Sequence, residues 1–146
     1  AQPLAEIATI LGYEVTIIDP RSAFANSKRF PNINIINDWP EEALIDFKID
    51  KRTAVVTLTH DPKLDDAALH AALKSEAFYI GSLGSKKTHN ARIQRLKNSN
   101  FTISEINKIH GPVGLSIGAK SPEEIAISIM SEITSTRNND KNSGKI

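Results

Sequence analysis

The chain has 146 residues, enough for one domain with a substantial hydrophobic core. Its 18 Lys and Arg residues nearly balance its 17 Asp and Glu residues, so the net charge of +1 gives no reason to expect nucleic acid or an anionic membrane as a partner. The absence of cysteine excludes disulfides, thiolate metal ligands and a cysteine nucleophile. No apolar run approaches the roughly 20 residues of a membrane span, and the N-terminus lacks a signal-peptide pattern. We therefore expect a cytoplasmic protein.

The first segment predicts an amphipathic helix followed by a strand. Apolar residues recur three and four positions apart over residues 2–11, and Gly12 then ends the helix. The β-branched run 15–18 predicts a buried strand that ends at Asp19. An α/β chain of this kind should begin with a strand and a glycine-rich turn. We therefore expect the numbered chain to lack its first element.

The middle of the chain predicts alternating strands and helices. The run 53–59 is nearly continuously apolar, which suits a central parallel strand covered on both faces. The predicted strands are 34–36, 53–59 and 78–80, and the predicted helices are 39–44, 64–74 and 86–98.

The C-terminal part predicts two further helices and a tail. Thr102 and Glu105 form a capping box that opens a short helix to His110. The glycine-punctuated run 111–118 predicts a loop, and Ser121 caps a helix that starts with proline and glutamate. From residue 137 the composition is polar, so we expect a folded domain over 1–136 and a disordered tail over 137–146.

These elements predict an α/β fold with a doubly wound parallel sheet that lacks its first strand and glycine-rich turn. Right-handed crossovers place the carboxyl ends of all strands at one edge of the sheet. Ligands of α/β folds bind at that edge, so the residues that follow each strand are the candidates for a functional site.

The stretch between the 78–80 strand and the 86–98 helix predicts an anion site. Backbone N–H groups at a helix start point outward, the helix dipole adds partial positive charge, and glycine permits close approach. The alternative is that the glycines only shape a tight turn. A Walker A loop is excluded because it needs four residues between its glycines. The candidate binding residues are Gly81, Ser82, Gly84, Ser85, Lys86 and Lys87.

Four residues after the other strands could also bind a cofactor. In a Rossmann arrangement an acidic residue ending the second strand binds a ribose 2′-OH, and Asp19 has that place. Arg21 could bind a phosphate instead, which leaves the choice between NAD and NADP open. Otherwise Asp19 is a turn residue before a proline.

His60 and Asp61 end the strongest predicted strand. His60 is the candidate catalytic residue, since a histidine can act as general acid or base near neutral pH. Asp61 could contact a ligand or simply cap the next helix. With Asp65 and Asp66 they suggest metal ligands, but no second histidine completes a set, so we predict no metal site.

Several segments in this order resemble the C-terminal, Rossmann-like domain of the xanthine dehydrogenase accessory (XdhC/CoxI) family. The resemblance covers residues 1 to about 133. Its most specific parts are the sequence Tyr79–Ser85, and Gly114–Ala119 followed by Pro122–Ala126. The other matching segments are Val15–Arg21, Phe24–Ala25, Arg29–Pro31 and Val56–Pro62 with Asp65.

The resemblance implies an accessory role in the maturation of molybdenum hydroxylases such as xanthine or carbon monoxide dehydrogenase. Family members hold molybdenum cofactor (molybdopterin) and pass it to the hydroxylase apoenzyme, working with a sulfurating desulfurase. The chain departs from the family in lacking the first strand, the glycine-rich turn and a separate N-terminal domain. We expect it to be either a single-domain member or a fragment.

Two other functions remain open. The first is an NAD(P)-dependent oxidoreductase with Asp19 on the ribose and His60 as acid/base, and the second is a non-catalytic interaction or oligomerisation domain. Losing a central strand would leave the 15–18 and 53–59 strands with unpaired edges. Either these strands pair directly, or a partner chain fills the gap and the protein is a homo-oligomer.

Overall fold

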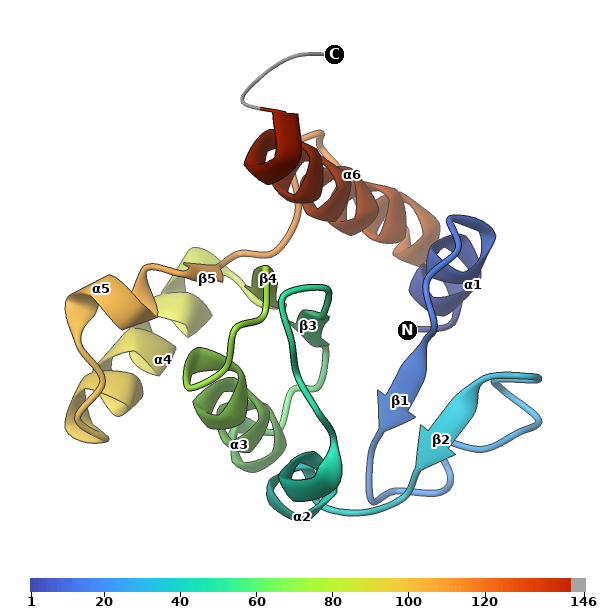
Figure 1. Cartoon of the computed structure of the whole chain (residues 1–146), viewed down its shortest axis with the longest axis horizontal. Coiled ribbons are helices and arrows are strands. Elements are labelled where there is room, and N and C mark those ends of the chain that lie inside the picture. Colours follow the sequence, from blue (N-terminus) through green and yellow to red (C-terminus); the bar gives the residue numbers. More distant parts are fainter. Residues whose placement is uncertain (143–146) are drawn as a thin grey trace.

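The computed structural model describes residues 1–142, over which helices and strands alternate (Figure 1). The elements are α1 (Gln2–Ile10), β1 (Thr16–Ile18), β2 (Asn34–Ile36), α2 (Pro40–Asp46), β3 (Ala54–Thr57), α3 (Pro62–Leu73), β4 (Tyr79–Ser82), α4 (Lys86–Asn98), α5 (Ile103–Ile106), β5 (Ile109–His110) and α6 (Pro122–Asn142). Within this part of the chain, no helix has the length and apolar character needed to cross a membrane.

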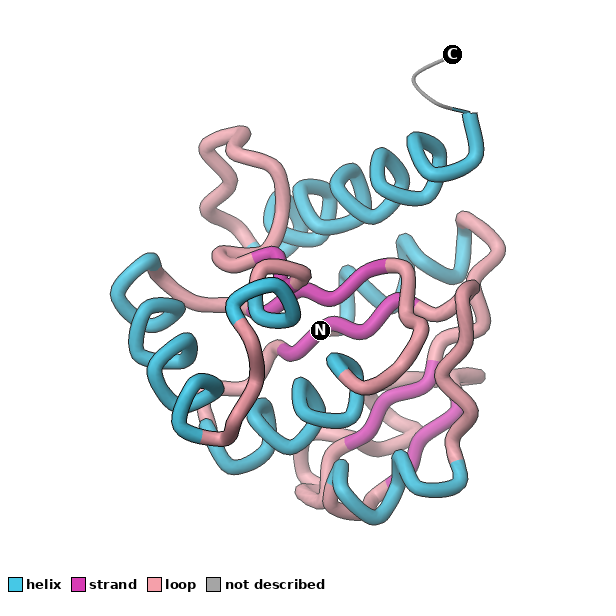
Figure 2. Tube along the Cα trace, turned by 60° about the vertical axis from the view of Figure 1, so that its left-hand side comes forward, coloured by secondary structure: helices cyan, strands magenta, loops and turns pink. Residues whose placement is uncertain are grey.

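Every strand pair in the described chain is parallel, as the alternation of strands and helices predicts. β1 and β2 form one sheet, and β3, β4 and β5 form a second sheet in that order. Parallel neighbours need crossover connections, and here these are α3 between β3 and β4, and α4 with α5 between β4 and β5. The carboxyl ends of β3, β4 and β5 therefore lie at one edge of this sheet. The Cα trace shows the strands side by side with helices around them (Figure 2).

Successive residues of β4 point to opposite faces of the sheet, and each face has its own core. Ile80 packs among side chains of α3, α4, α5 and β5, including the fully buried Leu69 and Leu96. Tyr79 packs on the other face against Ile129 and its neighbours on α6, with side chains of α1 completing this cluster. Covering of both faces is the doubly wound arrangement that the sequence predicts.

The expectation that the 53–59 strand is central is wrong for the described chain. β3 ends the order β3-β4-β5, so it is an edge strand, and Ala54–Val56 are only half-buried. β1 pairs with β2 and not with β3 within residues 1–142, so direct pairing of the two strands is also not found. That a partner chain fills the gap in a homo-oligomer stays a prediction.

Two further differences lie near the C-terminus. The capping box of Thr102 and Glu105 is present, but its helix ends at Ile106, and Ile109–His110 pair with β4 as β5. Helix α6 continues through Asn142, so residues 137–142 are helical where a disordered tail was expected. Arg137 ties this part of α6 to the segment after α1, because its Nη1 donates to the Tyr13 hydroxyl at 2.9 Å. The rest of the expected tail, residues 143–146, lies outside the described chain.

Candidate functional site

Buried polar side chains mark the carboxyl edge of the strands as the candidate site. Removing polar groups from water is costly unless they are paired, so their clustering indicates a built feature. Asp19 follows β1, and Thr57 and Ser82 end β3 and β4, where their hydroxyl groups hydrogen-bond to each other. Asp65 and Arg92, on the helices that follow β3 and β4, are also buried.

A cavity of about 540 Å³ lies at this edge, between the loop after β1 and the loop after β3. It places the candidate residues Arg21, His60 and Asp61 around one space. The candidate anion-binding stretch Gly81–Lys87 does not line this cavity. The lining residues are Arg21, Phe24, Leu58, Thr59, His60, Asp61 and Pro62.

Arg21, which lines the cavity, binds Asp19 through a bidentate ion pair. Its Nε donates to Asp19 Oδ1 at 2.9 Å and its Nη2 donates to Oδ2 at 2.8 Å. Burial alone would raise the pKa of Asp19, but the hydrogen bonds and the positive charge of Arg21 outweigh burial and lower the pKa. Both carboxylate oxygens of Asp19, the residue predicted to bind a ribose, therefore already accept hydrogen bonds from Arg21.

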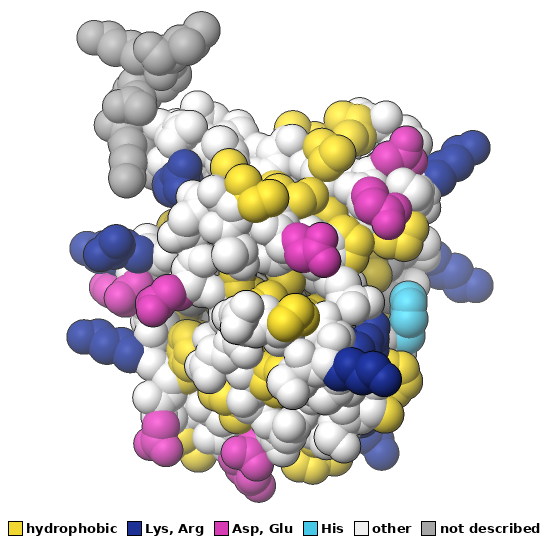
Figure 3. Space-filling model, turned by 90° about the vertical axis from the view of Figure 1, so that its right-hand side faces the viewer, with side chains coloured by type: hydrophobic (Ala, Val, Ile, Leu, Met, Phe, Trp, Pro, Cys, Tyr) yellow, Lys and Arg dark blue, Asp and Glu magenta, His cyan; other side chains and the backbone are white. Residues whose placement is uncertain are grey.

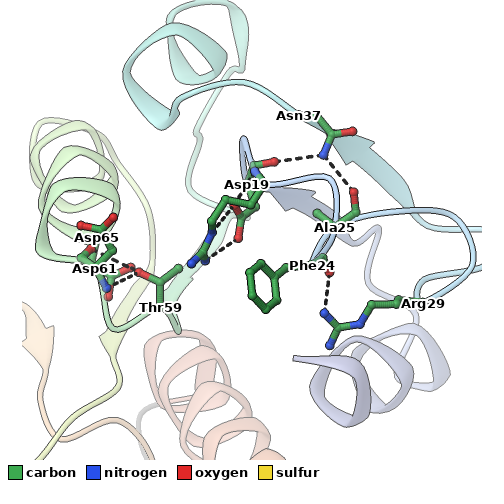
Figure 4. A network of polar contacts seen from close by, with 9 residues as sticks. Asp19, Phe24, Ala25, Arg29, Asn37, Thr59, Asp61 and Asp65 are labelled. Carbon is green, nitrogen blue, oxygen red and sulfur yellow. Dashed lines mark hydrogen bonds and ion pairs between the residues drawn. The ribbon is translucent and has the colours of Figure 1, made fainter.

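The loop that follows Asp19 is held in place by further polar contacts (Figure 4). Asn37 Nδ2 donates to the backbone carbonyls of Asp19 and Ala25 at 3.0 and 2.9 Å. Phe24 lies under the Arg21 guanidinium, 4.6 Å from its ring centroid, although the phenyl group is 53 % exposed. The cavity thus has a cationic and an aromatic group on one wall, which suits a planar or anionic ligand.

The opposite wall contains Thr59, His60 and Asp61. Asp61 is the N-cap of α3, because its Oδ1 accepts from the Lys63 backbone N–H at 3.0 Å. The Thr59 hydroxyl donates to Asp65 Oδ1 at 2.6 Å, and burial raises the pKa of Asp65 against this hydrogen bond. His60 is exposed at the cavity. Its catalytic role stays a prediction.

The described residues contain no group of three or more His, Asp or Glu side chains arranged to hold a metal ion.

The glycine stretch divides into a buried part and an open part. Gly81 and Ser82 belong to β4, and a side chain at Gly81 would collide with Val113 and Tyr79. The loop itself is Leu83–Ser85. Ser85 is the N-cap of α4, because its hydroxyl accepts from the Thr88 N–H at 3.1 Å.

The start of α4 is open to solvent. In the described structure the backbone N–H groups of Gly84, Ser85, Lys86 and Lys87 have no acceptor. Ser85, Lys86 and Lys87 are exposed. These groups remain available for an anion, although the loop and the 540 Å³ cavity are separate parts of the same edge.

The loop 111–118 lies beside this helix start, as the doubly wound order predicts. The Val113 N–H donates to the Ser82 carbonyl at 3.1 Å. His89, one turn into α4, lies so close to Gly111 that a side chain there would collide with its ring. Burial, followed by the charge of Arg92, lowers the pKa of His89, which favours the neutral ring.

Thr57 and Arg92 are not among the site residues expected from the sequence, and Asp65 enters there only as a metal candidate and as part of the family resemblance. A periodicity signal was present for the two charged residues. Asp65 precedes Leu69 by four positions and Arg92 precedes Leu96 by four, and both leucines are 0 % exposed. Residues four apart share a helix face, so both charges lie on buried faces.

One face of the molecule carries charges of both signs (Figure 3). On the face shown in Figure 3, basic and acidic side chains are interspersed, and hydrophobic side chains lie between them. A general positive field is therefore absent from this face, in agreement with the net charge of +1. Any preference for an anion must come from local groups such as those at the start of α4.

Comparison with known proteins identifies the family. The XdhC Rossmann domain matches residues 1–133. The chain is 36% identical over 136 residues to a probable xanthine dehydrogenase subunit of Bacillus subtilis, covering 92% of this chain and 39% of the relative. It is 31% identical over 137 residues to the "Molybdenum cofactor insertion chaperone PaoD" of Escherichia coli, covering 94% of this chain and 37% of the relative.

A solved structure agrees with these matches. The crystal structure of a xanthine dehydrogenase from Bacillus halodurans superposes with a TM-score of 0.82 at 34% identity, covering 99% of this chain and 41% of that chain. The chain thus spans about two fifths of the length of these relatives. It belongs to the XdhC family and corresponds to the Rossmann domain of that family.

Proposed function

We propose that this chain binds molybdenum cofactor, or a related phosphate-bearing ligand, and delivers it to a molybdenum hydroxylase apoenzyme. The observation that carries the proposal is the open amino end of α4, where backbone N–H groups without an acceptor in the described chain lie beside Lys86 and Lys87. Such a helix start binds phosphate groups well. The relative named as a molybdenum cofactor insertion chaperone supports this choice of ligand.

The residues present fit the phosphate end of a pterin cofactor. Glycine at position 84 has a φ of +143°, which orients the turn, and Lys86 and Lys87 add charge where the amides are free. With no cysteine in the sequence, no thiolate of this chain can bind the metal of the cofactor. In this proposal the chain holds and presents the ligand without turnover. A desulfurase, a homo-oligomeric state and a cytoplasmic location belong to the same proposal.

A dinucleotide-binding oxidoreductase is the second candidate. The buried position of Asp19 at the end of β1 favours it, since an acidic residue there binds a ribose in NAD enzymes. Against it, Arg21 already donates to both Asp19 oxygens, so a ribose hydroxyl would have to share the carboxylate with Arg21. His60 would then serve as acid/base at the cavity.

Thermal melting with added ligands distinguishes the candidates. A ligand held only by the folded state raises the melting temperature as RT ln(1 + [L]/Kd). We expect stabilisation by isolated molybdopterin and none by NAD(H). Transfer is tested by adding loaded protein to a molybdenum hydroxylase apoenzyme and measuring recovered activity against free cofactor at the same concentration. Stabilisation by NAD(H) alone would contradict the proposal, and a shift with neither ligand would favour an interaction domain.

A further inference from the structure

Arg92 is a buried cation directly beneath the start of α4. Arg92 is only 3 % exposed. Its Nη2 donates to the Leu83 carbonyl at 2.9 Å, and its Nη1 lies 3.1 Å from His89 Nδ1, which must be the acceptor because arginine has none. Its Nε is buried and has no hydrogen-bond partner among the described residues. A buried donor without an acceptor is costly and calls for a reason.

No carboxylate within residues 1–142 pairs directly with this charge. The ion pairs among the described residues join Arg21 to Asp19, Arg95 to Asp66 and His110 to Glu132. Asp65 and Asp66 attract Arg92 only from a longer distance, and burial still lowers the pKa of its guanidinium. Buried charges in proteins are normally paired, so a nearby anion would stabilise this positive charge.

The unpaired charge and the open helix start face the same turn. Arg92 Nη2 lies 3.5 Å from the place where a Cβ on Gly84 would stand, so the guanidinium supports the turn from below. On the outer side, the backbone N–H groups from Gly84 to Lys87 lack acceptors in the part of the chain that the structure describes. The buried arginine and the positive end of a 13-residue helix that begins with Lys86 and Lys87 therefore meet at one turn.

We propose that Arg92 is the buried counter-charge that makes the α4 start selective for a dianionic phosphate monoester over a monoanion. This inference rests on the proposed function and specifies the chemical class of the ligand group. Arg92 acts as a positioning residue: it fixes the Leu83 carbonyl and supplies charge through the turn, without touching the ligand. A phosphate monoester carries about −1.5 to −2 at pH 7, whereas a sulfate ester of the same shape carries one negative charge.

The test compares phenyl phosphate with phenyl sulfate, which differ mainly in charge. Binding to the purified protein is measured by titration calorimetry at pH 8 and low ionic strength. We expect the phosphate ester to bind at least about tenfold more tightly, since Coulomb attraction scales with ligand charge. The variant Arg92→Met should reduce this ratio to within about threefold, and Arg92→Lys, which keeps the charge, should retain most of it.

Arg95→Met is the matched control, because it removes the same charge from the same helix at a residue already paired with Asp66. It should leave the ratio unchanged. Circular dichroism melts establish that each variant is folded. If Arg92→Met unfolds, Arg92→Gln, which also removes the charge but keeps hydrogen-bond donors, takes its place and should likewise reduce the ratio.

Two results would overturn the inference. They are a wild-type protein that binds both esters equally, and an Arg92→Met variant that keeps the full ratio. If that variant keeps the ratio but weakens both esters by the same factor, Arg92 only shapes the loop. If molybdopterin still binds while the ratio is unaffected by Arg92→Met, this inference fails and the proposed function stands. Failure of the wild-type protein to bind molybdopterin at all counts against the proposed function.

Discussion

Replacing Glu132 by alanine removes the acceptor on which three segments of the chain converge. Glu132 Oε1 accepts from the Tyr79 hydroxyl at 2.6 Å and from the Gly114 N–H at 3.1 Å, and lies 3.3 Å from His110 Nδ1. This carboxylate on α6 thus joins β4, β5 and the start of the loop that reaches the site. Burial and the hydrogen bond to Glu132 raise the pKa of Tyr79, so its hydroxyl remains a donor.

The expected loss follows from these contacts. A hydrogen bond to a charged group contributes about 1.5–3 kcal/mol, and an orphaned buried donor costs a further 1–3 kcal/mol or so. Tyr79 is 1 % exposed, so its hydroxyl cannot reach water without rearrangement. Allowing for relaxation around the truncated side chain, we expect Glu132→Ala to destabilise the fold by about 3 kcal/mol. In a domain of this size that lowers Tm by roughly 10 °C.

Urea unfolding followed by circular dichroism measures this loss. Glu123→Ala, an exposed change on the same helix, is the control and should stay within about 0.5 kcal/mol of wild type. Glu132→Gln keeps an acceptor oxygen, so it should lose less than Glu132→Ala. A Glu132→Ala protein within about 1 kcal/mol of wild type would refute the reasoning, because it would show that water replaces all of these hydrogen bonds.

Three further predictions concern the loops and the edge. Gly114→Ala should destabilise the fold by about 1–3 kcal/mol more than Gly118→Ala in urea unfolding. Both glycines have positive φ, but only at Gly114 would a Cβ collide with Ser128. Equal losses would show that the backbone conformation alone causes the destabilisation. Asp61→Ala should cost about 1 kcal/mol in urea unfolding through loss of the α3 cap, with serine restoring most of it; unchanged stability would argue against a capping role. Because burial raises the pKa of Asp65, the folded state binds its proton more tightly and the wild type loses stability as pH rises from about 3.8 through the folded pKa. Unfolding of Asp65→Asn and wild type at several pH values should show the variant gaining relative stability over that interval, and a constant difference would contradict the shift.

Local signals made part of the fold predictable. The bounds of α4 are as the sequence predicts. Its N-cap is Ser85, a short polar residue that satisfies a first-turn backbone N–H regardless of tertiary context. The capping box of Thr102 and Glu105 is another such case. β5 was missed because Ile109 and His110 form a strand only through pairing with β4, which no local signal encodes.

The location of the site residues was predictable from the sequence, but the contacts that they make with one another were not. Parallel strands bring their carboxyl ends together, so the sequence places Arg21, His60 and Asp61 at one edge of the fold. In the structure all three residues line one cavity, while their roles there stay a prediction. The ion pair that occupies Asp19 was not predicted, because its geometry depends on the turn after β1. Arg92 is one of several basic residues on α4, a pattern that a solvated face and a phosphate clamp explain equally well, and only its spacing from Leu96 indicates that it is buried.

The most direct test of the central claim is titration calorimetry of isolated molybdopterin against wild-type protein and the double variant Lys86→Ala, Lys87→Ala. The control double variant Lys97→Ala, Lys108→Ala removes the same charge from exposed lysines outside the Gly81–Lys87 stretch. We predict that the first variant binds at least about tenfold more weakly than wild type, since both lysines act beside the free N–H groups of α4, while the control keeps its affinity. An unchanged affinity in the Lys86→Ala, Lys87→Ala variant would contradict the placement of the ligand at the start of α4.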